Sequence, residues 1–365
     1  MDFAFSDEQE MLRDSARQFV RDRYPPDRVA TLADGSGFDR SEWRALAEMG
    51  WTGISVPEAD GGAGLSFFEE MILAEELGRG LYPGPFFGSV VLALPLLRAT
   101  GGDELVAGLV AGERVATVAW AGPEGDFDVD PAPKMTWEGD RLTGVRLFVP
   151  DLAAAELLVV LGGLPEGTGV WAVDRDADGV AWRELPTVDA TRRMGEVALD
   201  GAAARLLGTI GPGELAKARD RALAALAAEA VGVGHAALDM GVAHAGTRVQ
   251  FGRPIGAFQA VSHQLAQAFL EIETARSLAY WAGWAVAEDQ PEAPTAAAAA
   301  KARAADAAVA ACERAIQVHG GTGFTWDHPL HRWYKRALGI SALMGWGAEH
   351  RSRIASAILD SDGAP

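Results

Sequence analysis

The sequence predicts an α+β protein in which a helical domain, a small β domain and a helical bundle follow one another along the chain. The prediction rests on two changes of hydrophobic period. Apolar residues recur at helical spacing over 1–112, form short runs between Gly, Pro and Asp clusters over 113–212, and return to helical spacing over 213–365. These three ranges are the predicted domains.

The first domain opens with a helix signal, because Ser6 followed by Gln9 is a capping-box pattern. Further helices are expected over 43–49 and over 67–77, each stopped by the glycine that follows it. The stretch between them, residues 54–64, is rich in proline and glycine. That composition predicts a specific loop.

The second domain is expected to be a small antiparallel β domain built from short strands. The third domain is expected to pack long helices, joined by short loops, into a bundle. The expected strands are 115–120, 142–149, 157–161 and 170–173, and the expected long helices are 216–249, 258–288 and 295–319.

Composition excludes several classes of function. A net charge of −19 is unsuited to a nucleic-acid or anionic-membrane surface. We find no apolar run of the ~20 residues that span a bilayer and no signal-peptide pattern. The single cysteine, Cys312, fits a reducing compartment and lies in an alanine-rich helical pattern typical of a small buried residue. We therefore expect a cytoplasmic protein without nucleic-acid or membrane partners.

Three motifs span nearly the whole chain in a fixed order. They are MGWTGISVPE at 49–58 with GGAG at 61–64, RVQFGRPIG at 248–256 with FQ at 258–259, and QVHGGTGF at 317–324. Together they resemble the acyl-CoA dehydrogenase family. The resemblance implies an N-terminal helical domain, a central β-barrel-like domain and a C-terminal four-helix bundle. Residues 325–329 are most similar to actinobacterial sterol-catabolism members, several of which are two-gene heterotetramers.

The resemblance also implies FAD as cofactor, an acyl-CoA or carrier-bound acyl thioester as substrate, and an electron-transferring flavoprotein as electron acceptor. It implies a homo- or hetero-oligomer, a dimer or a tetramer, in which these residues reach the adenosine-diphosphate half of FAD held by a neighbouring subunit. The implied cofactor-binding residues are Arg248, Gln250, Phe251, Gln259, Gln317, Val318, Gly320 and Gly321.

The chemistry of these residue types agrees with that role. The planar, permanently charged guanidinium of Arg248 suits a pyrophosphate. Gln317 offers a donor and an acceptor to a nucleotide edge. Gly320 and Gly321 let the backbone approach a ligand closely.

The catalytic base of the family has no counterpart at either of its two usual positions. Alignment without gaps places Met344 and Ala222 there, and neither side chain can accept a proton. No catalytic residue is therefore assigned. Asp220, Glu229 and Glu349 lie close in sequence, but a shift of one residue turns a helical side chain by ~100°. A register slip would be needed to use one of them, and otherwise they are expected to be helix-surface charges or charges at a subunit contact.

The β domain departs from the family where the flavin ring is expected. Residues 119–126 replace the usual Thr-Glu-Pro and Gly-Ser, and Phe148-Val149-Pro150 replaces a Trp-Ile-Thr-like strand whose threonine contacts flavin. Pro150 has no N–H and no side-chain donor. Three functions stay open: FAD-dependent α,β-desaturation, a base-less partner subunit that completes the FAD site of a heterotetramer, or a repurposed family member such as a monooxygenase.

Other catalytic motifs find little support. His328 and His331 have a spacing that can bind metal on a helix, but Pro329 between them indicates a loop, so no metal site is expected. We find no Gly-x-Ser-x-Gly elbow and no Gly-x-Gly-x-x-Gly after a strand.

Overall fold

The computed structural model describes residues 5–35, 37–127, 129 and 132–359. They form two compact units. One unit, here called the helical unit, comprises Met1–Gly35, Phe67–Tyr82 and Leu223–Pro365, and the other, the β unit, comprises Ser36–Ser66 and Pro83–Ala222. The division of the sequence into three domains stays a prediction.

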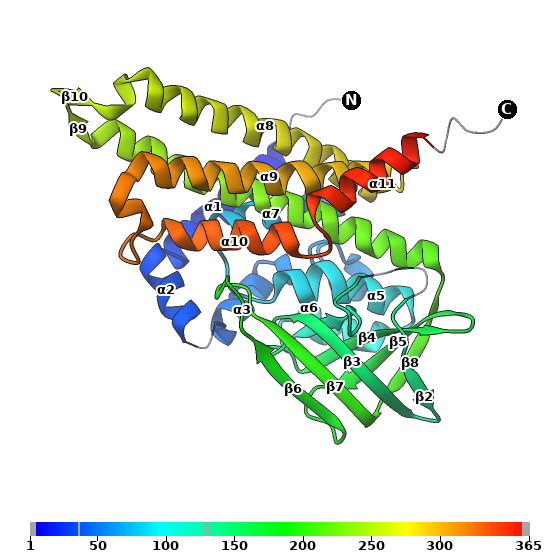
Figure 1. Ribbon diagram of the computed structural model, residues 1–365. Helices are drawn as coiled ribbons and strands as arrows, with labels where there is room; N and C mark the ends of the chain where they lie inside the picture. Colours follow the sequence, from blue (N-terminus) through cyan, green and yellow to red (C-terminus); the bar gives the residue numbers. More distant parts are fainter. Residues whose placement is uncertain (1–4, 36, 128, 130–131, 360–365) are drawn as a thin grey trace. The chain divides into compact units, whose positions relative to one another are not determined.

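The helical unit packs the first helices of the chain with the C-terminal bundle. Within the bundle, α9 contacts α8, α10 and α11. Figure 1 shows α8, α9 and α10 running side by side. The helices are α1 (Asp7–Arg23), α2 (Pro26–Asp34), α4 (Phe67–Arg79), α7 (Pro212–Thr247, which begins in the β unit), α8 (Gln259–Ala287), α9 (Ala293–His319), α10 (Leu330–Ala342) and α11 (Gly347–Leu359). The capping box of Ser6 and Gln9 is confirmed at the start of α1.

The crossing of α4 and α7 explains a helix end that the sequence placed wrongly. Helix α4 continues through Gly78 to Arg79. A Cβ atom at Gly78 would overlap the carbonyl oxygen of Glu229, and one at Gly232 would overlap the carbonyl oxygen of Glu75. The two glycines therefore let two helix backbones touch, and Gly78 serves close packing rather than termination.

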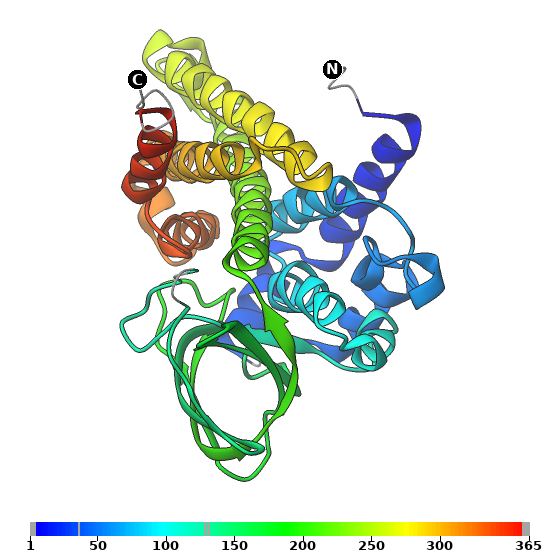
Figure 2. The same cartoon turned by 90° about the vertical axis from the view of Figure 1, so that its right-hand side faces the viewer.

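The β unit contains two four-stranded sheets, in the orders β1-β4-β5-β8 and β2-β3-β7-β6. Figure 2 shows the two sheets curving round a common interior. Side chains such as Leu142, Val160, Trp171 and Val197 fill that interior. The strands are β1 (Ala116–Ala119), β2 (Thr136–Glu138), β3 (Arg141–Pro150), β4 (Leu157–Leu164), β5 (Gly167–Asp174), β6 (Val180–Leu185), β7 (Met194–Ala203) and β8 (Arg205–Ile210).

The sheets differ from the expected antiparallel arrangement at one pair of strands. Strand β1 runs parallel to β4, with Ala116 opposite Leu157. Short helical segments lie in the same unit and account for the remaining chain. They are α3 (Arg40–Glu48), η1 (Trp51–Gly53), η2 (Glu58–Asp60), η3 (Phe86–Ala93), α5 (Leu94–Ala99) and α6 (Asp103–Val110).

Helix α7 differs from the expectation that the chain has no run able to span a membrane. It is long and apolar enough to do so by length and composition, with a mean hydropathy of 1.3 over its most apolar window. However, 83 % of that window is buried inside the fold. A helix in the core of a protein can pass the same test by its length and composition.

Candidate functional site: the nucleotide end of the bundle and the vacant base positions

Arg248 and Phe251 lie on a short hairpin that projects from the end of α7 (Figure 1). The hairpin pairs β9 (Val249–Gln250) with β10 (Arg253–Pro254). Phe251 occupies its tip with a left-handed backbone (φ +51) and a side chain that is 92 % exposed. A large apolar side chain that is exposed to solvent on a strained backbone indicates a surface that another molecule covers.

Two histidines bring the hairpin and the glycine-rich segment together. The ring of His244 in the last turn of α7 stacks on the ring of His319 at the end of α9, with centroids 4.3 Å apart. The backbone N–H of Arg248 donates to the carbonyl of His244, and His319 lies two residues beyond Gln317. Burial, with the positive fields of His319 and Arg248, lowers the pKa of His244. The two sequence-predicted segments therefore converge at one end of the bundle.

A pocket of about 600 Å³ opens beside the glycine-rich segment. Gly320 has φ +65, and a Cβ atom at Gly320 or Gly321 would meet nothing within 4 Å. The backbone of η5 (Gly320–Phe324) is thus open to a ligand. The lining residues are Glu313, Ile316, Gln317, Gly320, Gly321, Phe324 and Tyr334.

Four of these lining residues were not predicted from the sequence. Glu313 precedes Gln317 by four positions on α9, so helical spacing alone would have found it. Tyr334 is contributed by α10, and its hydroxyl donates to Glu313 at 3.2 Å. Nothing in the sequence pattern marks that tyrosine.

The other predicted residues lie outside this pocket. Gln259 is exposed at the first position of α8, and Gln250 is exposed with its side-chain amide donating to the carbonyl of Val249 at 2.8 Å. Val318 is half-buried on α9. Among the pocket-lining residues that the structure describes, none of these three appears. Their role in cofactor binding stays a prediction.

The two positions where family members carry the catalytic base hold buried apolar side chains in this chain. Ala222 on α7 is fully buried, and Met344, in the turn after α10, is 5 % exposed with φ +59. Neither group can accept a proton from a substrate carbon. Each unit therefore presents a packed hydrocarbon side chain where the family alignment places a carboxylate.

The acids near the two base positions in sequence, Asp220, Glu229 and Glu349, bind other groups of the chain. Two of them are not the surface charges that the sequence suggested. Glu229 is 6 % exposed and Asp220 is 3 % exposed. Glu229 Oε1 lies 2.5 Å from Arg336 Nη1, and Asp220 Oδ1 lies 3.3 Å from Arg219 Nη2. The interpretation as helix-surface charge is wrong for both, because each carboxylate is buried against an arginine.

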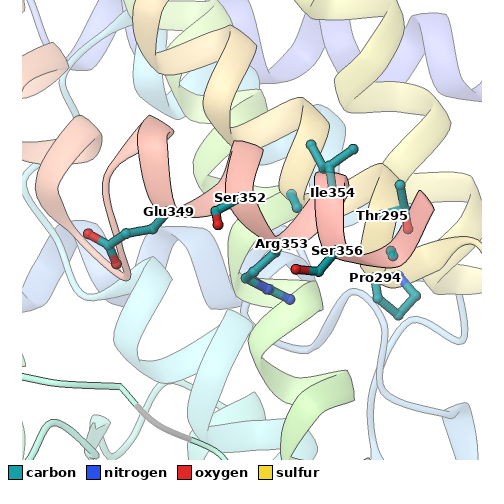
Figure 3. Close-up of a pocket in the computed structure, with 9 residues that line it drawn as sticks. Pro294, Thr295, Glu349, Ser352, Arg353, Ile354 and Ser356 are labelled. Atoms are coloured by element: carbon teal, nitrogen blue, oxygen red, sulfur yellow. The ribbon is translucent and has the colours of Figure 1, made fainter. Parts of the chain in front are cut away.

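Glu349 is exposed, and it lines a surface groove of about 470 Å³ between α9 and α11. Figure 3 shows Glu349 near the start of α11, with Ser352, Arg353 and Ser356 following along the helix and Thr295 on the facing α9. Its Oε1 accepts the backbone N–H of Trp346 at 3.3 Å. This carboxylate therefore closes the first turn of α11.

Residues 148–150 and the loop at 119–126, which depart from the family pattern, make contacts within the β unit. Thr117 Oγ1 donates to the carbonyl of Pro150 at 2.5 Å, so this buried hydroxyl is engaged within the sheet. Phe148 has φ +50 and is 41 % exposed. A Cβ atom at Gly125 would lie 2.8 Å from the Phe148 ring, so the ring packs on the loop that replaces the family pattern.

Comparisons with known proteins place the chain in a family. The model of the "Acyl-CoA dehydrogenase, N-terminal domain" matches residues 6–109, and that of the "Acyl-CoA dehydrogenase, C-terminal domain" matches residues 219–359. The chain belongs to the acyl-CoA dehydrogenase family. It is 31 % identical over 358 residues to acyl-CoA dehydrogenase IpdE2 of Mycolicibacterium smegmatis, covering 97 % of this chain and 100 % of that protein.

Solved acyl-CoA dehydrogenases share the whole fold. A chain of the Tcur3481-Tcur3483 steroid ACAD G363A variant is 34 % identical with a TM-score of 0.88, covering 98 % of this chain and 99 % of that one. A chain of the ChsE4-ChsE5 complex from Mycobacterium tuberculosis is 30 % identical with a TM-score of 0.90, covering 100 % of both. These similarities confirm the fold class and the likeness to the actinobacterial sterol-catabolism subgroup.

FAD is the cofactor of acyl-CoA dehydrogenases, and the nucleotide end of the bundle fits its phosphate and adenine half. Arg248 is exposed, and its guanidinium forms no hydrogen bond or ion pair with any residue that the structure describes. Gln317 is exposed beside the open backbone of Gly320 and Gly321. A free bidentate donor, an amide and an uncovered backbone match a dinucleotide.

The histidines of this region pack on one another. Within 5–35, 37–127, 129 and 132–359, no three or more His, Cys, Asp and Glu side chains are grouped so that they could hold a metal ion. His328 instead packs on His319, with ring centroids 4.4 Å apart.

Proposed function

We propose that this chain is the partner subunit of a heteromeric acyl-CoA dehydrogenase, in which it completes an FAD site while a second chain supplies the catalytic base. The observation that carries the proposal is the pair of buried apolar side chains, Ala222 and Met344, at the two base positions. Desaturation requires removal of the proton α to the thioester, and neither residue has a group that can take it.

The exposed groups of Arg248, Gln317, Gly320 and Gly321 support the proposal that this chain completes an FAD site. When bound, FAD supplies the acceptor for the hydride that leaves the β carbon of the acyl group. In this chain Arg248 would neutralise the pyrophosphate, Gln317 would bind the nucleotide edge, and the backbone at Gly320 and Gly321 would approach it closely. The remaining predicted contacts, from Gln250, Phe251, Gln259 and Val318, belong to the same proposal.

Exposed aromatic side chains at this end support assembly with another subunit. Phe251, Phe324 and Trp326 are 92 %, 84 % and 74 % exposed. Aromatic residues are enriched at protein interfaces, and apolar surface of this kind is usually covered. An FAD held mainly by the second chain would be closed off by these residues.

Similar proteins support a heteromeric form. Two of the solved relatives, the ChsE4-ChsE5 complex and the Tcur3481-Tcur3483 steroid ACAD, pair two differently named chains. For this chain we propose the same kind of partner, an acyl-CoA or carrier-bound acyl thioester as substrate, an electron-transferring flavoprotein as electron acceptor, and the cytoplasm as location.

The test is to purify the full chain alone and together with the product of the neighbouring gene, and to measure flavin per protomer by visible absorption. We expect little flavin on the chain alone and stoichiometric flavin on the complex. A fully flavinylated homo-oligomer that oxidises acyl-CoA unaided would contradict the partner-subunit role and restore the autonomous dehydrogenase.

A further inference from the structure

The turn that carries Met344 has an unusual backbone. Residues 343–346 connect α10 to α11, and two consecutive residues among them, Met344 and Gly345, have positive φ values of +59 and +104. A non-glycine residue in the left-handed region persists only when its surroundings over-determine it. Gly345 has little room as well, because a Cβ atom there would lie 3.1 Å from Glu349 Oε2 and 3.4 Å from the His350 ring. Contacts from surrounding residues must therefore stabilise the backbone of this turn.

Two buried side chains from different helices converge on one carbonyl of the turn. Lys301 Nζ on α9 lies 3.3 Å from the carbonyl oxygen of Gly345, and His350 Nε2 on α11 lies 3.1 Å from the same oxygen. Lys301 Nζ also lies 3.5 Å from the carbonyl oxygen of Ser341, in the last turn of α10. Lys301 is fully buried and His350 is 2 % exposed. The histidine contact is a hydrogen bond in the tautomer that carries its proton on Nε2.

The charge of Lys301 is not used to pair with an acid. Within the part of the chain that the structure describes, Lys301 forms no ion pair. Asp306 on α9 is bound by Arg351 at 2.9 Å, and Glu349 accepts from Trp346. Burial lowers the pKa of Lys301 to about 8, against the opposing fields of Asp306 and Glu349. An ammonium buried against carbonyls without a counter-charge lowers stability, so the contribution of Lys301 lies in the two carbonyls that it holds.

We propose that Lys301 and His350 are positioning residues, which hold the Gly345 carbonyl and thereby fix position 344 in one preformed conformation. The inference deepens the proposed function and rests on it only in that position 344 is one of the two vacant base positions. The turn thus keeps one shape although position 344 carries no carboxylate. The groups that face Lys301 are the carbonyls of Ser341 and Gly345, with Asp306 on α9 and Glu349 and His350 on α11 nearby.

Trp346, in the same turn and 56 % exposed, is a built-in reporter. The experiment is fluorine NMR of the full chain labelled with fluorotryptophan, with the Trp346 resonance assigned from Trp346→Phe. We expect Lys301→Met to displace that resonance, because it removes the donor to the Gly345 carbonyl. Lys301→Arg keeps a charged donor and should retain the wild-type position. The resonance of Trp171, in the core of the β unit, serves as internal control.

The histidine is tested by a conservative pair of variants. His350→Gln retains a donor for the Gly345 carbonyl and should keep the wild-type resonance, whereas His350→Leu should displace it. Lys217→Met, at an exposed lysine paired with Glu214, should change nothing. A Trp346 resonance that stays at its wild-type position in both Lys301→Met and His350→Leu would overturn the proposal. Because neither flavin nor a partner is needed, failure here is distinguishable from failure of the proposed function.

Discussion

Glu229 and Arg336 form an ion pair inside the helical unit, with Glu229 Oε1 2.5 Å from Arg336 Nη1. Both residues are buried, with exposed fractions of 6 % and 1 %. The pair ties α7 to α10, and Gly78 of α4 packs directly on the backbone of Glu229. Three helices that are distant in sequence thus meet at one residue. An acid that is a candidate base by sequence proximity is a structural anchor.

Removing one member of this pair is expected to destabilise the fold strongly. Glu229→Gln removes the carboxylate charge that pairs with the buried Arg336 guanidinium, and breaking a buried ion pair in this way costs about 3–5 kcal/mol. Urea unfolding followed by circular dichroism measures the loss. The double variant Glu229→Gln with Arg336→Met should recover part of it, since no unpaired charge remains. Equal stability of Glu229→Gln and wild type would show that the pair is not an anchor.

The contact of Gly78 with Glu229 predicts a second, purely steric effect. Gly78→Ala adds a methyl group that overlaps the Glu229 carbonyl, so α4 must shift away from α7. We expect a loss of about 1–3 kcal/mol in the free energy of unfolding, even though alanine is the better helix former. Gly213→Ala, at the start of α7 where a Cβ atom meets nothing within 4 Å, is the matched control and should be neutral or stabilising. A stabilised Gly78→Ala variant would contradict the close crossing.

The buried lysine predicts a defined pH dependence of stability. Burial lowers the pKa of Lys301 from an ordinary value of 10.5 to about 8, so between these values the unfolded chain holds a proton that the folded chain has released. The free energy of unfolding should therefore rise with pH across that window, by roughly 3 kcal/mol. Denaturant unfolding of wild type and Lys301→Met at several pH values isolates this contribution as a difference. Parallel pH profiles for the two proteins would contradict it.

Arg248 is predicted to hold the cofactor through its charge. Arg248→Gln should weaken FAD binding by the heteromeric complex about 10- to 100-fold, which corresponds to a charged hydrogen bond of about 1.5–3 kcal/mol. Flavin retained after gel filtration, read from the visible spectrum, measures the effect. Arg183→Gln, at an exposed ion pair with Glu196 on the β unit, should retain wild-type flavin. Equal flavin loss in both variants would remove the specific role of Arg248.

The order of the helical and strand segments could be predicted from sequence, because its signals are local. Helical periodicity located α8 and α9 within a few residues. The motifs around Arg248 and Gln317, through their resemblance to the family, indicated two segments that the structure brings together through His244 and His319. The role of these segments in cofactor binding stays a prediction.

Other features depend on contacts between distant residues. A charged helical residue such as Glu229 has the pattern of a surface group until Arg336, 107 positions away, is placed beside it. Gly78 has the pattern of a helix end, and only the approach of α7 reveals its packing role. The parallel pairing of β1 with β4 and the buried position of Lys301 follow from topology in the same way.

The central claim, that this chain completes an FAD site but has no base, is tested most directly by anaerobic addition of acyl-CoA to two samples that contain equal FAD. One sample is the chain alone in a solution of free FAD, and the other is its FAD-loaded complex with the second subunit. We predict that the flavin absorption bleaches in the complex and persists in the chain alone. Bleaching by the chain alone would contradict the account, because it would require a proton acceptor that neither Ala222 nor Met344 supplies.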